Sequence, residues 1–232
     1  MGTVTIADVR AAHHKIESVV ADLDDAALRV PSLLPGWSIA HVIAHVALNA
    51  EAFGRVADEL RAGRSGFMYP GGMAGRTADI DALASAPATE ILARLRAGDE
   101  RFLETWADPA PSGTCATADG LPTFPADTVI LRRLREVEVH GLDTGLPQLD
   151  TSTWSSAYVD ADLPTQWETV VRRTEQPVTI VDELGVAWSA GSGDAVTARL
   201  TRREILAWVL DRGVVVGLPT LVAWGDLSRW RA

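Results

Sequence analysis

The sequence predicts an α+β protein in which an N-terminal four-helix bundle is followed by a small domain with a short antiparallel sheet. Between residues 5 and 145, apolar residues recur three and four positions apart in four long segments, which is the spacing of helices. After residue 177, short runs rich in valine alternate with turn residues, which is typical of strands. We place the domain boundary so that the bundle spans residues 1–146 and the second domain spans residues 147–232.

The composition and the charge favour a cytoplasmic protein without a nucleic-acid or membrane partner. The 232 residues carry a formal net charge of −10, and no basic run could follow a phosphate backbone, so we expect no nucleic-acid partner. The single cysteine, Cys115, excludes an internal disulfide and fits a reducing compartment. No signal peptide is recognisable, and no apolar run approaches the roughly 18 residues of a membrane span, so we expect no membrane partner. We expect a monomer or a weak homodimer.

The first helix is predicted from Thr5 to about Leu23, and Thr5 or Asp8 can cap its start. It carries two adjacent histidines, His13 and His14. Because neighbouring helical residues point about 100° apart, the two rings cannot both face one site. We expect one ring to be packed and the other to be exposed.

The second helix is predicted from Ser38 to about Ala62, with Gly36 in the turn before it and Ser38 as the N-cap. Its first half is apolar almost all round, which indicates a helix inside the bundle. His41 and His45 are four residues apart and lie about 40° apart on one side of this helix, so both are expected to enter the interior. A single buried histidine is more often packed and hydrogen-bonded than bound to a metal.

Residues 63–75 are predicted to form a glycine-rich loop. A loop of this length inside a compact domain is uncommon and often functional. Tyr69 within the loop and Arg76 just after it carry polar groups that can hold a ligand. The alternative is that Met68 and Tyr69 simply cap the bundle.

The third helix is predicted from about Ala86 to Trp106. Prolines and a glycine then break the pattern, and residues 111–124 are expected to form a loop or a short hairpin. Cys115 lies in this segment, where the sequence shows neither a base nor a helix N-terminus that would lower the pKa of its thiol. We therefore expect Cys115 to be unreactive.

A fourth helix is predicted from Pro125 to a stop near Gly141 or Gly145, because proline is tolerated in the first helical turn. The segment from Glu136 to His140 also alternates as a strand would, but the longer apolar pattern before it favours a helix. On a helix, Glu136 and His140 lie one turn apart on the same face.

These two residues allow two interpretations. Taken alone, Glu136 would pair with Arg132 or Arg133. His140 would then be an exposed cation near the helix C-terminus, where the helix dipole favours positive charge. Together with His45, however, Glu136 and His140 form a set of two imidazoles and one carboxylate. Such a set leaves the fourth position of a tetrahedral metal open, as in catalytic zinc sites, and four-helix bundles build metal sites in this way.

The second domain is expected to begin with a helix from Trp154 to about Thr174 that is broken or restarted at Pro164. Three strands then follow as a meander or a pair of hairpins. They span residues 177–182, 186–189 and 195–200. A capping box of Thr201 and Glu204 starts the last helix, which is expected to end at Arg212-Gly213.

Three motifs carry a resemblance to a known family. They are Leu34-Pro-Gly-Trp-Ser-Ile-Ala-His41-Val-Ile-Ala-His45-Val-Ala-Leu-Asn49, Met68-Tyr69-Pro70 with Arg76, and Arg133-x-Arg135-Glu136-Val-Glu-Val-His140-x-Leu-Asp143. In these motifs the chain resembles the mycothiol-dependent maleylpyruvate isomerase family, whose N-terminal part is a DinB-like metal-binding four-helix bundle. The resemblance covers residues 5–146, and Leu210-Asp211-Arg212-Gly213 is similar to the C-terminal arginine element of that family.

The resemblance implies one divalent metal per chain, most simply zinc, with His45, Glu136 and His140 as its ligands. It implies mycothiol as a thiol cofactor and places His41 and Asp143 beside the ligands, where Asp143 can orient a ligand histidine. We expect Arg212 to be the catalytic cation that stabilises developing negative charge. The proposed binding residues for substrate or thiol are Tyr69 and Arg76, with Arg76 as a clamp for a carboxylate.

The family reaction is the cis–trans isomerisation of maleylpyruvate to fumarylpyruvate in aromatic degradation. Transient addition of a thiol turns the double bond into a single bond, and elimination gives the trans product. A zinc- and mycothiol-dependent transferase acting on another electrophile, in detoxification or secondary metabolism, would share the same metal site. The third alternative is a metal-binding bundle without catalytic activity.

Overall fold

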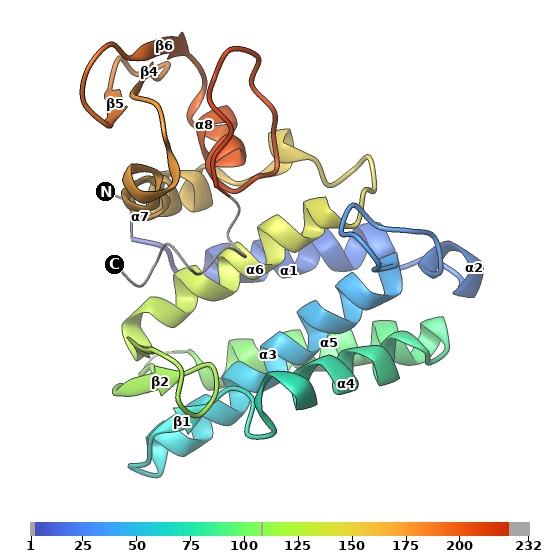
Figure 1. Ribbon diagram of the computed structural model, residues 1–232. Coiled ribbons are helices and arrows are strands. Elements are labelled where there is room, and N and C mark those ends of the chain that lie inside the picture. The colour runs from blue at the N-terminus through green and yellow to red at the C-terminus, as the bar shows by residue number, and fades with distance from the viewer. Residues whose placement is uncertain (1–2, 108, 223–232) are drawn as a thin grey trace. The chain divides into compact units, whose positions relative to one another are not determined.

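The computed structural model describes residues 3–107 and 109–222 and confirms the α+β class. The chain forms two compact units, one of residues Val4–Thr153 and the other chiefly of the chain from Trp154 onward (Figure 1). Within the described ranges, none of the helices combines the length and the hydrophobicity needed to cross a membrane.

The first unit is built around four long helices. They are α1 (Ile6–Val20), α3 (Ile39–Arg61), α5 (Ala88–Thr105) and α6 (Val129–Asp143), and a short helix α2 (Asp25–Leu28) joins the first two. Helices α1 and α3 each pack against both α5 and α6, so the four helices enclose one core, as the sequence predicts. The first half of α3 is buried on nearly every side, because small and β-branched residues surround it.

The entry to α3 is held by hydrogen bonds at both ends of the preceding turn. Ser38 and His41 form the capping box of the helix, with 2.8 Å between Ser38 Oγ and His41 Nδ1. Gly36 has a φ of 79°, which a glycine adopts without strain. The amide of Leu33 donates to the carbonyl of Asp143 at 2.9 Å, which ties this turn to the end of α6. The N-terminal part of α3 therefore lies beside the C-terminal part of α6.

The segment predicted as a loop at residues 63–75 is more ordered than expected. Strand β1 (Gly66–Phe67) pairs in parallel with β2 (Thr114–Ala116), and β2 pairs in antiparallel with β3 (Thr123–Pro125), so the expected hairpin is present. Helix α4 (Gly72–Ala84) then follows, and the sequence analysis did not predict it. Its buried residues are confined to its last turns. The sequence therefore lacks the repeated apolar spacing from which a helix is predicted.

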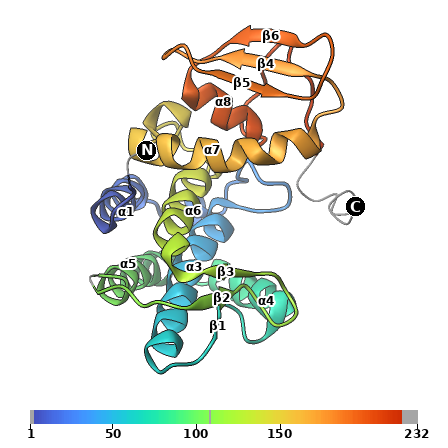
Figure 2. The same ribbon diagram turned by 90° about the vertical axis from the view of Figure 1, so that its left-hand side faces the viewer.

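The second unit places a mixed sheet against two helices. Its elements are α7 (Ser156–Arg173), β4 (Val178–Val181), β5 (Ala187–Ala190), β6 (Val196–Arg199) and α8 (Arg202–Val209). Figure 2 shows the three strands of this sheet and the two helices α7 and α8. The rings of Trp167 and Trp188, from α7 and β5, lie 5.7 Å apart, and Trp208 of α8 lies 6.3 Å from Trp167. These contacts form an aromatic core between the sheet and the helices.

Two predictions for this unit were wrong. The strand order is β5-β4-β6 with β4 and β6 parallel, so the sheet is mixed and not the expected antiparallel meander. The central strand is the one that buries Val178 and Ile180, because a central strand is shielded at both edges. Helix α7 also continues through Pro164 without a break: the proline removes one backbone N–H donor, while buried side chains such as Leu163 and Trp167 anchor the helix on both sides of it.

The last helix, α8, begins at the predicted capping box but ends before the predicted stop at Arg212-Gly213. Thr201 and Glu204 form the capping box of α8. The helix stops at Val209, and Asp211 adopts a left-handed φ of 61° that turns the chain away. Arg212 therefore lies in the loop after α8, where its amide donates to the carbonyl of Ala207 at 2.8 Å.

Candidate metal centre

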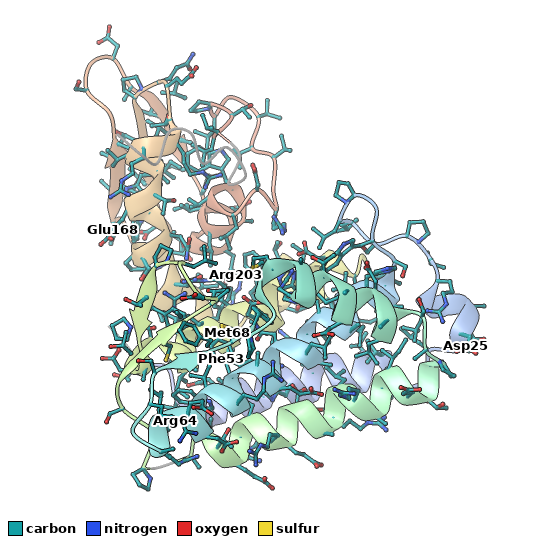
Figure 3. All side chains as sticks on the ribbon, turned by 60° about the horizontal axis from the view of Figure 1, so that its bottom comes forward. Asp25, Phe53, Arg64, Met68, Glu168 and Arg203 are labelled. Carbon is teal, nitrogen blue, oxygen red and sulfur yellow. The ribbon has the colours of Figure 1, made fainter. Side chains whose placement is uncertain are left out.

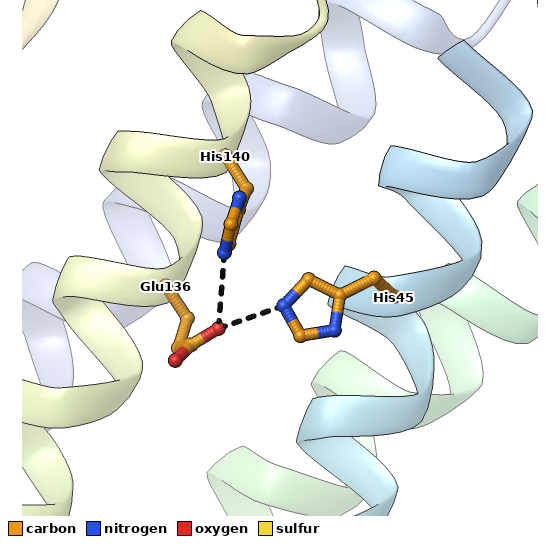
Figure 4. A group of neighbouring side chains, drawn as sticks. All are labelled: His45, Glu136 and His140. Carbon is orange, nitrogen blue, oxygen red and sulfur yellow. Dashed lines mark hydrogen bonds and ion pairs between the residues drawn. The ribbon is translucent and has the colours of Figure 1, made fainter. Parts of the chain in front are cut away.

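The packing of α3 against α6 brings together three side chains that are far apart in the sequence. His45 comes from α3, and Glu136 and His140 come from adjacent turns of α6 (Figure 4). One nitrogen of each imidazole and one carboxylate oxygen all lie within 4.8 Å of one another. Glu136 Oε2 is 3.0 Å from His45 Nε2 and 3.4 Å from His140 Nε2. The three atoms therefore converge on one point.

Buried helix faces fix the two imidazoles. The side chain of His45 is 4% exposed, and its ring meets the ring of His140 edge to face at 4.5 Å between centroids. The ring of Trp37, in the turn before α3, lies 5.9 Å from the ring of His45. These ring contacts mean that packing within the bundle helps to orient the two imidazoles.

The outer nitrogen of His140 is held by a carboxylate. Nδ1 of His140 lies 2.9 Å from Oδ2 of Asp143, which is fully buried. The carboxylate accepts, so Nδ1 carries a proton and Nε2 faces Glu136. This is the usual arrangement of a histidine that binds a metal through Nε2. Asp143 thus lies where the sequence analysis expected a residue that orients His140.

The charges of the three residues depend on one another. Burial lowers the pKa of His140, but hydrogen bonds to Asp143 and Glu136 outweigh it and raise the pKa to about 9. Burial and the nearby His140 lower the pKa of His45 to about 4. Burial raises the pKa of Glu136, yet the two histidines bring it well below its ordinary value. The site therefore combines an anionic carboxylate with one neutral and one cationic imidazole at neutral pH.

Arg76 and Tyr69 close one side of the site. Just after strand β1, the backbone amide of Tyr69 donates to the carbonyl of Thr117 at 2.9 Å. This hydrogen bond positions the tyrosine. Nη2 of Arg76, in the first turns of α4, donates to Nδ1 of His45 at 3.0 Å, and its guanidinium lies 5.6 Å from the centre of the Tyr69 ring. Burial and the charge of Glu136 raise the pKa of the Tyr69 hydroxyl, although Arg76 and Asn49 hydrogen-bond to it.

Two cavities meet at this side. A cavity of about 300 Å³, which we call the inner cavity, is lined by the three converging residues, by apolar side chains and by three arginines. The arginines are Arg76, Arg132 and Arg135. Phe53 and Met68, which are labelled in Figure 3, form part of its apolar wall. A larger cavity of about 510 Å³ shares only His45, Tyr69 and Arg76 with it.

Of the two arginines that the sequence offered as partners of Glu136, Arg133 lies elsewhere in the bundle. Arg132 lies over the ring of Phe124 at 4.1 Å, and its Nε donates to Thr128 at 3.0 Å, so it lines the inner cavity. Arg133 does not serve Glu136: it is fully buried and donates to Asp99 at 2.6 Å. The spacing of Arg132, four residues before Glu136 on the same helical face, was the available signal for its place in the cavity.

The other predicted site residues lie in different surroundings. His41 caps α3 through Ser38, and its Nε2 lies 3.8 Å from Asp81. Cys115 lies buried in β2, where burial raises the pKa of its thiol. Arg212 belongs to the second unit, and its Nη1 donates to the carbonyl of Leu210 at 2.9 Å.

The fold and the site define a class of protein: a helical bundle in which side chains on facing helices form a candidate metal centre. Residues 9–145 match the profile of the family described as mycothiol maleylpyruvate isomerase N-terminal domain. The chain therefore belongs to this family, which confirms the relationship that the motifs predicted.

Solved structures support the same fold beyond the bundle. The crystal structure of the mycothiol-dependent maleylpyruvate isomerase superposes with a TM-score of 0.82 at 19% sequence identity, covering 94% of this chain and 95% of that chain. A histidine-to-alanine mutant of the isomerase gives the same values. No curated protein sequence matches the chain. At this identity, the likeness concerns the fold.

Proposed function

We propose that the protein is a zinc- and mycothiol-dependent cis–trans isomerase that acts on maleylpyruvate. The observation that carries this proposal is the convergence of His45, Glu136 and His140 beside an arginine-lined cavity. Membership in the family and the likeness to the isomerase structure give it further support.

The three converging residues fit a zinc ion by their chemistry. Two imidazoles and one carboxylate are common zinc ligands, and three protein ligands leave one position for an exchangeable group. When bound, zinc supplies Lewis acidity that lowers the pKa of a thiol in that position. Asp143 holds the Nδ1 proton of His140, so Nε2 is the nitrogen that would bind the ion once its own proton has left. Glu136 supplies the negative charge that a cation needs.

The inner cavity has the charge expected for an acidic substrate. Three arginines line it against one glutamate, while the whole chain has a net charge of −10. Guanidinium groups bind carboxylates through paired hydrogen bonds. Maleylpyruvate carries a carboxylate at each end of its carbon chain, and the apolar side chains of the cavity suit the carbons between them.

The reaction needs no oxidant and no net proton. The mycothiol thiolate adds to one carbon of the cis double bond, and the electron pair of that bond moves onto the adjacent carbonyl as an enolate. Rotation about the resulting single bond is free. The enolate electrons then re-form the double bond and expel the thiolate, which leaves the trans product. Arginine side chains in the cavity stabilise the enolate and the carboxylates by charge and hydrogen bonds.

An absorbance assay on maleylpyruvate tests the proposal. The zinc-loaded protein should form the trans isomer only when mycothiol is present, and the mycothiol concentration should remain constant. Glu136→Gln should remove the activity, whereas Arg64→Gln should retain it because Arg64 pairs with Glu59 on the surface. Consumption of mycothiol in step with the substrate would instead identify a transferase. No reaction by the folded, zinc-loaded protein would refute the isomerase.

A further inference from the structure

The two histidines of the candidate metal centre are held by opposite kinds of partner. The outer nitrogen of His140 faces the carboxylate of Asp143, which accepts a hydrogen bond. The outer nitrogen of His45 faces Nη2 of Arg76 at 3.0 Å. A guanidinium has five N–H donors and no acceptor, so Nδ1 of His45 must be the acceptor in this bond. The partner therefore fixes whether the outer nitrogen carries a proton: it does in His140 and does not in His45.

The bond from Arg76 selects one tautomer of His45. Because Nδ1 accepts, the ring proton lies on Nε2, from which it is donated to Glu136 at 3.0 Å. A zinc ligand must offer the lone pair of that same Nε2, and its proton must then lie on Nδ1. In that second tautomer, two N–H donors would face each other between His45 and Arg76. Binding through Nε2 therefore requires the guanidinium to leave Nδ1.

We propose that Arg76 is a positioning residue that couples metal binding at His45 to the binding of an anionic group in the inner cavity. The inference rests on the metal site of the proposed function. When the proton moves from Nε2 to Nδ1, the charge of the ring does not change, and Arg76 loses its acceptor. A carboxylate in the inner cavity, which Arg76 lines, gives the guanidinium a new acceptor. Each ligand thereby favours the other.

The position of Arg76 allows this exchange of partners. It lies in the first turns of α4, after Gly71, Gly72 and Gly75, and its side chain is half-buried. It borders both cavities, so its long side chain can turn from His45 into either of them. Thermodynamic linkage makes the effect reciprocal: an anion raises the affinity for zinc by the same factor by which zinc raises the affinity for the anion.

Nitrogen-15 NMR of the imidazole rings tests the tautomer directly, without metal and without substrate. In the wild-type protein, His45 should carry its proton on Nε2. Arg76→Gln should raise the share of the Nδ1–H tautomer, because the glutamine carbonyl can accept from Nδ1. Arg76→Lys, which can only donate, should behave as the wild type does. An Nδ1–H tautomer of His45 in the wild type would overturn the proposal.

Zinc affinity, measured by competition with a chromophoric chelator, tests the coupling. Fumarate is a suitable probe, because its two carboxylates point apart and cannot both bind one zinc ion. Fumarate should raise the zinc affinity of the wild type, within the roughly 5- to 150-fold range of coupled sites. Arg76→Gln should bind zinc more tightly than the wild type, and fumarate should no longer change its affinity.

Arg132→Gln is the matched control, because it removes the same charge from the same cavity without touching His45. If repulsion between arginine and zinc were the whole effect, both variants would gain zinc affinity equally, and the proposal would be wrong. The proposal would also be refuted if fumarate left the zinc affinity of the wild type unchanged, or if the wild type bound no zinc. None of these measurements uses mycothiol or turnover, so the isomerase proposal can fail while the coupling holds.

Discussion

At the scale of single residues, His41 and His45 show how one helical turn separates two roles. Both lie on α3, yet His45 is buried against His140 whereas His41 turns back to Ser38 at the helix start. We therefore expect His45→Ala to abolish stoichiometric zinc binding. His41→Ala should keep zinc and lower the melting temperature modestly, because it removes half of a capping box. Elemental analysis and thermal melts of both variants make the comparison, and zinc retained by folded His45→Ala would contradict it.

Cys115 is the second residue with a clear expectation. Its thiol is buried in β2, and burial raises its pKa, so it is a poor nucleophile at neutral pH. If an external thiol performs the addition, Cys115→Ser should retain the isomerase rate, with some loss of stability because a hydroxyl replaces a buried sulfur. The rate with saturating mycothiol is the measurement. A large loss of rate in the folded variant would make Cys115 part of the chemistry.

At the scale of elements, the four long helices of the bundle are tied together by one buried arginine. Arg133 of α6 donates to Asp99 of α5, to Asn49 of α3 at 2.8 Å and to His13 of α1 at 3.0 Å. All four side chains are almost completely buried. This cluster lies one turn from Glu136 on α6 and one turn from His45 on α3, so it sets the register of the two helices that carry the candidate ligands.

Arg133→Met should therefore destabilise the fold by about 3–5 kcal/mol, because it leaves a buried carboxylate without its partner. Arg101→Met is the control, since Arg101 and Asp58 form an exposed ion pair worth about 0–1 kcal/mol. Adding Asp99→Leu to Arg133→Met should recover part of the loss, because no charge is then left unpaired. Urea unfolding of the variants measures these changes. An equal loss of unfolding free energy in Arg101→Met and Arg133→Met would contradict this account.

The same cluster predicts how stability depends on pH. Burial and Arg133 lower the pKa of His13 to about 2, so below pH 6.5 the unfolded chain binds a proton that the folded chain does not, and stability falls as pH falls. Burial raises the pKa of Asp99 to about 7, so between pH 3.8 and 7 the folded chain holds the extra proton, and stability rises as pH falls. The two trends oppose each other above pH 3.8, and only that of His13 continues below it.

Because the variant lacks the trend of His13, the free energy of unfolding of His13→Leu should rise relative to that of the wild type as the pH falls from 7 to 4. At lower pH the variant should lose less than the wild type. Urea unfolding at a series of pH values measures both trends. A variant that follows the wild-type curve would show that His13 is not held neutral in the fold.

At the scale of the whole molecule, the second unit carries Arg212, the residue that the sequence analysis expected to be the catalytic cation. Its backbone amide and Nη1 both serve the loop after α8, so a local role is visible. If Arg212 stabilises charge in the isomerase reaction, Arg212→Ala should lower kcat by about 10²–10³ and leave the zinc content unchanged. Arg212→Lys should restore little, because lysine lacks the planar fork. Normal kcat with a lower melting temperature would leave only the local role.

Much of this protein follows from local patterns in its sequence. Capping residues and apolar spacing predicted α1, α3, α5 and α6, because the helical period of about 3.6 residues is visible in the spacing of apolar residues along the sequence. The pairing of Glu136 with His140 follows from the geometry of a single helical turn. The motifs around His45 and His140 were sufficient to identify the family, as the profile match over residues 9–145 confirms.

Other features were decided only by tertiary structure. Helix α4 has too few buried residues to show a period, so the contact of Arg76 with His45 was not foreseen. Arg132 and Arg133 are neighbours in sequence, and only the packing of α6 sends one into a cavity and the other into the core. The pairing of β6 was predicted wrongly, because β6 lies parallel to the central strand β4 and not in an antiparallel meander. In each case the outcome depends on contacts between segments distant in sequence, which local spacing does not encode.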